Sequence, residues 1–454
     1  MPLAAGPVAP IGAHALLIFL LQVGLLLLLA LGLGRLAVRV GAPAIVGELL
    51  AGVLAGPSVL AHIAPGLQGW LLPHDVAQFH LLDAVGQVGV LLLVGITGIH
   101  LDLDLVCRRG LTAVRISIAG IVIPFGLGVA TGVLLPGSLV PGSAERSTFA
   151  LFLGVAMGVS AIPVIAKTLM DLRMLHRNIG QLMLSAAMID DVVGWLLLAI
   201  VSGIATGGVQ AGSVMLSVGY IALVIALAVL ARPFVRRALR LADTSDRARN
   251  GGVTVTLVIV LVLLGAAATQ AMRLEAVFGA FVCGIMINSC GGLGAARLAP
   301  LRSTVMSFLA PLFFATAGLR MDLTLLGRPA VLIAGLCVLL AAVLGKFAGA
   351  YAGARLSRMG HWEALALGAG MNARGVIEVI IAMVGLRLGV LSPQMYTIIV
   401  LVAVVTSLMA PPILRLTIGR VEQTAEERLR EEFYEADRTR DAHELAHCFT
   451  VSVR

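Results

Sequence analysis

The sequence predicts an all-α polytopic membrane protein with about thirteen transmembrane helices, arranged as inverted repeats with two broken crossing helices. Of the 454 residues, 59% are apolar and only 12% are charged, and the mean hydropathy is +1.03. A soluble domain carries about 25% charged residues. The apolar residues form continuous blocks of about 20 residues, the length at which a helix crosses a bilayer. Because lipid offers the backbone no hydrogen bonds, such blocks cross the membrane as helices.

Thirteen apolar blocks follow one another along the chain. In order, they occupy residues 14–34, 42–60, 80–99, 113–135, 148–168, 180–204, 213–231, 251–270, 276–290, 303–319, 330–352, 363–386 and 394–414. Spans 1–6 and 8–13 form two halves, and span 7 links them, so that the halves have opposite orientations in the membrane. The halves show no clear similarity residue by residue, and this repeat is therefore inferred from spacing.

The basic residues are concentrated in every second loop. The richer set is Arg35, Arg39, Arg108, Arg109, Arg115, Lys167, Arg173, Arg177, Arg232, Arg236, Arg237, Arg240, Arg247, Arg249, Arg297, Arg302, Arg355, Arg358, Arg415 and Arg420. The alternate loops hold Arg146, Arg273, Arg320, Arg328 and Arg387. The positive-inside rule predicts a multi-pass cell-membrane protein with its N-terminus outside and its C-terminus in the cytoplasm. This orientation also accounts for the net charge of +8, so that no nucleic-acid partner is expected.

The predicted domain organisation is a transmembrane domain over residues 1–416 and a short charged cytoplasmic tail over 417–454. The tail is dense in Glu and Arg and is too short to fold as a nucleotide-binding regulatory domain. The five cysteines lack the spacing of a disulfide framework or a metal site. The sequence shows no Ser–His pair or metal-ligand motif typical of an enzyme. We therefore expect neither an enzyme nor a cofactor or resident metal.

Asp190 and Asp191 lie together in the middle of the span 180–204. A carboxylate at the centre of a spanning helix costs about 2.5–3.5 kcal/mol and marks a functional site by default. Neighbouring side chains on a helix point about 100° apart. One carboxylate can therefore face a water-filled cavity while the other faces a neighbouring helix. The alternative is a pair that only forms hydrogen bonds between helices.

Lys346 lies inside the apolar span 330–352. The chain has 32 Lys and Arg residues, and only Lys167 and Lys346 are lysines. Unlike Arg, a buried Lys releases its proton readily, so Lys346 is a candidate proton carrier. The alternative is a lysine that extends along the helix to the membrane interface.

Two further polar interruptions occur, in the fifth and twelfth spans. Ser160 and Pro163 interrupt the span 148–168, where a proline breaks or kinks a helix. Asn372, Arg374 and Glu378 interrupt the span 363–386, and the last two can form an ion pair four residues apart. These spans hold the fifth position of each half, and paired broken helices are typical of secondary transporters with a site at the membrane midplane. A plain proline kink and a purely structural ion pair are the alternatives.

These residues, in this order, resemble the monovalent cation:proton antiporters of the cation/proton antiporter-2 family, including plant CHX-type exchangers. The resemblance covers about residues 14–416. It extends to residues 47–58 (GELLAGVLAGPS), 312–322 (LFFATAGLRMD) and 372–375 (NARG) followed by Glu378.

The resemblance implies a homodimer of thirteen-span protomers, each with a core domain that moves against a dimerisation domain. It implies that Asp191 takes the transported cation or proton and that Asp190 and Ser160 belong to the same cation- and proton-binding site. Asp190 is expected to pair with Lys346, and Ser160 to lie in the crossed, unwound helices. The double aspartate resembles the electrogenic members, whereas many CHX-type members have Asn before a single Asp.

The predicted function is exchange of Na⁺ or K⁺ for protons by alternating access. A carboxylate in the cavity binds either a proton or a cation. One alternative is a sodium-coupled organic anion symporter, which the aspartate pair disfavours, since an anionic substrate needs positive groups. A second alternative is a non-transporting membrane sensor, for which the tail is too short to supply a signalling domain. The sequence does not distinguish Na⁺ from K⁺.

Overall fold

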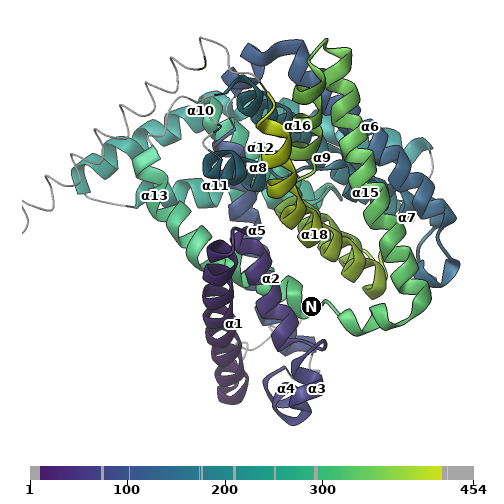
Figure 1. Ribbon diagram of the computed structural model, residues 1–454. Helices are drawn as coiled ribbons and strands as arrows, with labels where there is room; N and C mark the ends of the chain where they lie inside the picture. Colours follow the sequence, from purple (N-terminus) through teal and green to yellow (C-terminus); the bar gives the residue numbers. More distant parts are fainter. Residues whose placement is uncertain are drawn as a thin grey trace, which may run out of the picture.

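The computed structural model describes residues 11–72, 76–101, 103–172, 174, 177–207, 211–249, 252–290, 295–421 and 427. Throughout these residues, every regular element is a helix (Figure 1). The all-α prediction is therefore confirmed.

The helices are, in chain order, α1 Ala13–Arg39, α2 Ala44–Ala55, α3 Leu60–Ile63, α4 Pro65–Leu71, α5 Val76–Ile99, α6 Leu103–Leu134, α7 Arg146–Gly158, α8 Ile162–Asp171, α9 Asn178–Gly207, α10 Ala211–Arg249, α11 Val253–Ala271, α12 Ala276–Ser289, α13 Ala295–Thr304, α14 Ala310–Leu319, α15 Pro329–Leu356, α16 His361–Met371, α17 Val376–Arg387 and α18 Pro393–Ile418. Three shorter elements are the 3-10 helices η1 Gly137–Leu139 and η3 Leu323–Gly327 and the π-helical segment η2 Val305–Leu309.

The predicted number of spans agrees with this architecture. Among the described residues, eleven segments are long and apolar enough to cross a membrane, and one of them joins α7 and α8. The pair α16 and α17, bent by 45°, forms a further broken span. The apolar helix α12, with 14 residues, occupies the position of the predicted ninth span.

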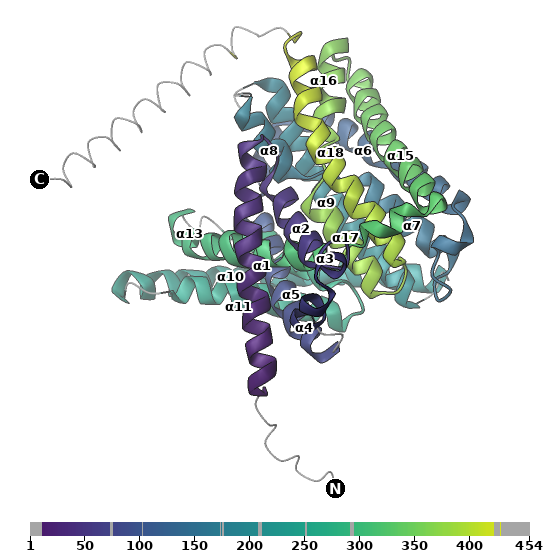
Figure 2. The ribbon, with the colours of Figure 1, turned by 60° about the horizontal axis from the view of Figure 1, so that its bottom comes forward.

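The spans form two bundles (Figures 1 and 2). The first bundle contains the first three spans of each half, namely α1, α2 and α5 with α11, α12 and α14. The second bundle contains the last three spans of each half, namely α6, α7/α8 and α9 with α15, α16/α17 and α18. Helix α10 links the halves and packs on α9, α11 and α12.

The helix contacts repeat between the halves, as an inverted repeat requires. Helix α1 packs on α2 as α11 packs on α12, and α2 packs on α14 as α12 packs on α5. Helices α6 and α15, which begin the second part of each half, pack against each other. The contacts therefore support the repeat that was inferred from spacing.

Two glycine pairs at the same spacing, one in α2 and one in α12, allow four of these close approaches. A Cβ on Gly47 of α2 would lie 2.2 Å from the Leu33 carbonyl oxygen of α1, and one on Gly52 would lie 1.9 Å from that of Ala315 in α14. In α12, a Cβ on Gly279 would lie 2.2 Å from the Gly265 oxygen of α11, and one on Gly284 would lie 2.2 Å from the Gly95 oxygen of α5. Small residues let helix backbones meet closely in membranes.

The halves therefore do share a residue-level pattern, contrary to the sequence analysis. Besides the two glycine pairs, residues 97–103 (TGIHLDL) correspond to residues 317–323 (AGLRMDL), which end the third span of each half. The similarity is short and falls at helix contacts, which is why hydrophobic patterning alone did not reveal it.

The predicted tail begins close to the end of α18, which continues to Ile418. Of the rest of the predicted tail, only 419–421 and Glu427 belong to the described residues. Glu427 Oε1 accepts a hydrogen bond of 2.6 Å from the backbone nitrogen of Asn178, at the start of α9.

The glycine contacts give a first prediction. Gly52→Ala should destabilise the protein by about 1–3 kcal/mol or more, because its methyl group overlaps backbone atoms of α14 that cannot move independently. Thermal unfolding in detergent measures the change. Gly32→Ala in α1 is the matched control, since nothing lies within 4 Å of a Cβ at that position. Equal melting temperatures for the two variants would contradict the proposed close packing.

Candidate functional site: the crossing of two broken helices

Two interrupted spans meet in the second bundle. The chain is extended between α7 and α8, with φ and ψ of −91° and 146° at Val159 and −118° and 105° at Ala161. The other interruption separates α16 from α17 at residues 372–375. The Ala161 backbone nitrogen donates a hydrogen bond of 2.9 Å to the Ala373 carbonyl, which joins the two breaks directly. Both predicted interruptions are therefore present, and they touch.

Pro163 has a different position from the one that a proline kink implies. It is the second residue of α8, within the first turn, where its missing N–H would have no helical partner. The break precedes it, at residues 159–161. Pro163 therefore begins the second half of the broken span.

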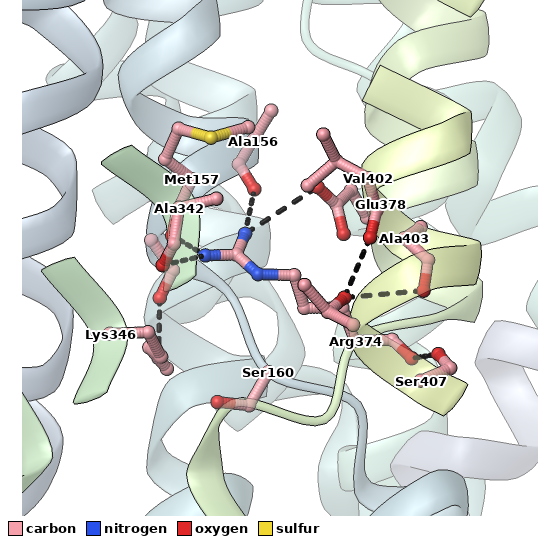
Figure 3. Close-up of polar contacts among 12 residues, drawn as sticks. Ala156, Met157, Ser160, Ala342, Lys346, Arg374, Glu378, Val402, Ala403 and Ser407 are labelled. Atoms are coloured by element: carbon pink, nitrogen blue, oxygen red, sulfur yellow. Dashed lines mark hydrogen bonds and ion pairs between the residues drawn. The ribbon is translucent and has the colours of Figure 1, made fainter. Parts of the chain in front are cut away.

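Two cationic side chains bind the carbonyl groups exposed at the end of α7. Arg374 donates to Ala156 O at 2.8 Å and to Met157 O at 2.6 Å (Figure 3). Lys346 Nζ donates to Gly158 O at 2.6 Å. The last carbonyls of a helix lack intrahelical partners and carry partial negative charge. Arg374 and Lys346 thus satisfy the end of α7 inside the membrane.

Arg374 also pairs with Glu378, as its spacing predicted. Its guanidinium lies 3.4 Å from Glu378 Oε1, and both side chains are buried. A further bond of 3.0 Å reaches the Ala342 carbonyl of α15 (Figure 3). The Arg374 carbonyl accepts a hydrogen bond from Ser407 of α18. This arginine therefore connects α7, α15, α17 and α18.

Asp190 is held from three sides. Lys346 Nζ lies 2.6 Å from Asp190 Oδ2, and both side chains are 0% exposed. Ser160 Oγ lies 2.8 Å from the same carboxylate oxygen, and Ser117 Oγ of α6 donates to Oδ1 at 2.5 Å. Ser160 Oγ also lies 2.9 Å from the Met371 carbonyl at the end of α16. The pairing of Asp190 with Lys346 is thus present in the geometry.

Asp191 is in a different situation, although it is the next residue of α9. Its side chain is fully buried, and neither carboxylate oxygen has a hydrogen-bond partner among the residues that the structure describes. Ser160, which the sequence analysis assigns to the same site as both aspartates, contacts Asp190 and leaves the Asp191 oxygens without a partner in the described part of the chain. A buried carboxylate without partners is costly as an anion. This group can therefore accept a proton or a cation.

Asn372 lies in the second break, close to the Ala161–Ala373 contact in the chain. It is buried, and its side-chain oxygen has no partner among the described residues. It is not part of the Asp190 contacts.

Sequence reasoning did not identify Ser117 as a partner of Asp190, or the carbonyls of α7 as partners of Arg374 and Lys346. A single serine in an apolar span has no distinctive signal, since serines often bond to their own helix. The contact between Ser117 and Asp190 joins residues 73 positions apart. Only the packing of α6 on α9 brings them together.

A cavity of about 540 Å³ separates the bundles near this crossing. The second bundle lines it with Ile162, Pro163, Met188 and Val376, and the first bundle lines it with residues that include Phe314. Its polar lining consists of Glu48, Thr97, His100, Lys167 and Arg302. Asp191 is not among the lining residues, so its carboxylate is closed off from this cavity.

The other end of the bundle interface is held by polar contacts. Arg387 at the end of α17 lies 2.5 Å from Glu275 at the start of α12. The Tyr396 hydroxyl of α18 donates to the Ala317 carbonyl of α14 at 2.8 Å. The interface therefore has a cavity towards one end and an ion pair and a hydrogen bond towards the other.

Comparisons with known proteins identify the family and the fold. A family model described as sodium/hydrogen exchanger, transmembrane, matches residues 24–418. The Na(+)/H(+) antiporter NhaS4 of Synechocystis sp. is 31% identical over 401 residues, which are 88% of this chain and 97% of that protein. Cation/H(+) antiporter 20 of Arabidopsis thaliana is 32% identical over 389 residues, which cover 82% of this chain but 45% of that longer protein.

A solved structure shows the same fold. The sodium proton antiporter MjNhaP1 from Methanocaldococcus jannaschii superposes with a TM-score of 0.63 at 16% identity, and the match covers 89% of this chain and 99% of that one. The family model covers most of the chain, including both broken spans. The chain therefore belongs to the sodium/hydrogen exchanger family.

Proposed function

We propose that this chain exchanges a monovalent cation, Na⁺ or K⁺, for protons across the membrane, and that Asp191 carries the exchanged ion. The family and the antiporter relatives support the activity. The observation that supports the site is the fully buried Asp191 carboxylate, which has no partner among the described residues. A proton and a cation compete for the Asp191 carboxylate, which carries one or the other in each transport step. Exchange of one ion for the other follows from this competition.

Charge balance at the crossing favours one bound positive charge. The buried ionisable groups there are the cations Lys346 and Arg374 and the carboxyl groups of Asp190, Asp191 and Glu378. Lys346 pairs with Asp190 and Arg374 pairs with Glu378, so that Asp191 has no counter-ion. An unpaired charge is expensive in a low-dielectric interior. The bundle should therefore move only after Asp191 has bound H⁺ or a metal cation.

Alternating access would use the two ends of the bundle interface. The cavity is lined by Lys167 of α8 and Arg302 of α13, which belong to the basic set that the positive-inside rule assigns to the cytoplasmic side. Asp191 is closed off from this cavity in the structure. Its carboxylate would be reached from the cavity in one state of the cycle, and from the Arg387–Glu275 end once the cavity has closed and that end has opened. Such rocking of one bundle against the other is the general mode of secondary transporters.

The arrangement disfavours the organic anion symporter. An anionic substrate needs free positive groups at its site, but Arg374 and Lys346 already bind carbonyls and carboxylates. Carboxylate, hydroxyl and carbonyl oxygens bind Na⁺ and K⁺ alike. We therefore assign the transported ion to the class of monovalent cations.

We place the protein in the cell membrane as a homodimer, with its N-terminus outside and its C-terminus in the cytoplasm. The loop charges support the orientation. The long apolar face of α1, which includes exposed Leu20, Leu28 and Leu31, supports lateral contact with lipid or a second protomer.

The central prediction concerns Asp191. Asp191→Asn should abolish cation-driven proton flux in proteoliposomes, because the amide cannot exchange a proton for a cation. The assay is dequenching of a pH-sensitive dye on addition of Na⁺, K⁺, Rb⁺ or Li⁺. Asp322→Asn is the matched control, since Asp322 caps η3 away from the crossing. Wild-type flux in a folded Asp191→Asn protein would remove Asp191 from the mechanism.

A second prediction concerns the Lys346–Asp190 pair. Lys346→Gln or Asp190→Asn alone should destabilise the protein by about 3–5 kcal/mol, because each leaves a buried charge without its partner. The double variant should recover much of that loss. Melting temperatures in detergent of the two single variants and the double variant measure the coupling, and strictly additive losses would reject it.

The same variants test Lys346 as a proton carrier. If Lys346 releases a proton during the cycle, the double variant should move less net charge for each cation transported. Transport currents on a solid-supported membrane, normalised to cation flux, measure this ratio. An unchanged ratio would leave Lys346 with a structural role alone.

Orientation is tested by labelling. Arg236 on α10 and Trp70 on α4 are both exposed and should face the cytoplasm and the outside, respectively. In a background without native cysteines, an impermeant thiol reagent added outside intact cells should label Trp70→Cys and leave Arg236→Cys unlabelled. The reverse pattern would invert the topology.

A further inference from the structure

Glu48 is a charged residue in the membrane that the crossing does not use. It is the one charged residue of α2, whose sequence is AIVGELLAGVLA. Its side chain is partly exposed, and it forms no hydrogen bond or ion pair with any residue that the structure describes. A carboxyl group in a spanning helix is costly and calls for a functional explanation.

The position of Glu48, at two solvent-accessible spaces, provides a functional explanation for this carboxyl group. Glu48 lines the cavity of about 540 Å³ between the bundles. It also lines a groove of about 780 Å³ between α1, α2 and the segment that leads into α14. Helix α2 lies between α1 and the second bundle in both views (Figures 1 and 2). Glu48 is therefore reachable from the cavity that leads towards the crossing.

The other charged side chains that line these spaces are positive. Lys167 of α8 and Arg302 of α13 line the cavity, and Arg35 and Arg39 of α1 line the groove. Glu48 is the one carboxylic acid among the lining residues of either space. A basic rim repels an approaching cation, and a single carboxylate inside the rim lowers that barrier.

We propose that Glu48 is a second ion-binding group, which holds the transported cation or a proton on its way between the solution at this face and Asp191. This proposal rests on the proposed exchange activity and assigns Glu48 to one face of the protein. The cavity extends to the Lys167 and Arg302 end, whereas the opposite end is held by the Arg387–Glu275 pair. Glu48 should therefore affect ion entry from the Lys167 and Arg302 side and leave entry from the other side unchanged.

The experiment measures the half-saturating cation concentration separately at each face. Transporter is reconstituted in one orientation, cation is varied on one side, and proton flux is recorded. Glu48→Gln should raise the half-saturating concentration at the Lys167 and Arg302 face about tenfold, in line with electrostatic focusing. The value at the other face and the maximal flux should stay within about twofold, because Asp191 is intact.

Three variants control for folding and for charge. Glu48→Asp keeps the charge and should remain close to wild type. Glu363→Gln removes a carboxylate that caps α16 and does not line the cavity, and it should have no effect. Arg302→Gln removes a positive charge from the cavity and should lower the half-saturating concentration at the same face.

The outcomes separate this proposal from the proposed function. If Glu48→Gln matches wild type at both faces while Asp191→Asn is inactive, the exchange activity stands and the role of Glu48 is overturned. Equal changes in the half-saturating concentration at both faces would also overturn it. If Glu48→Gln fails to fold, the Arg302→Gln variant decides, and an unchanged half-saturating concentration in that variant would overturn the role of Glu48. Loss of all flux in the wild-type protein would instead reject the exchange activity itself.

Discussion

The need to satisfy backbone polar groups inside the membrane determines the chemistry at the crossing. Breaking α7 leaves carbonyl oxygens at its end that water cannot reach, and Arg374 and Lys346 bind them. These buried cations in turn need carboxylates, which Glu378 and Asp190 supply. Asp191 is then the carboxylate without a counter-ion. In the proposed exchange, a cation or proton at Asp191 completes the network, and the backbone break and the proposed ion site are then parts of one electrostatic arrangement.

The inverted repeat explains how such a network can face either side of the membrane. Close glycine contacts join α2 to α14 and α12 to α5 within the first bundle, and α6 packs along α15 within the second. The contacts between bundles include the Arg387–Glu275 pair and the Tyr396–Ala317 hydrogen bond. Contacts of this polar kind can break and reform, whereas interlocked helix backbones cannot slide without steric overlap. The bundles therefore suit movement as two units.

The sequence revealed the fold and the charged members of the site because lipid makes both conspicuous. Uninterrupted apolar blocks predicted the spans, and Asp190, Asp191, Lys346 and Arg374 stood out as charges within them. The partners were less predictable, since Ser117 reaches Asp190 through helix packing and the carbonyls of α7 have no sequence signal. Glycine pairs in α2 and α12 were visible in the sequence, but their meaning depends on which backbones they meet. Composition therefore identifies costly groups, and packing determines what binds them.

The two buried cations differ in a way that fits their positions. Arg374 uses its planar, permanently charged guanidinium to bind three carbonyls and Glu378, a role that requires several fixed donors. Lys346 binds one carbonyl and Asp190 through a single nitrogen, which can lose a proton when the attraction of its carboxylate weakens. A cation arriving at Asp191 would compete for the neighbouring Asp190 charge and weaken that attraction. The basic residues of this chain are almost all arginines. The lysine at position 346 suits the proposed proton carrier, which changes its charge, and the arginine at position 374 suits a group that keeps its charge.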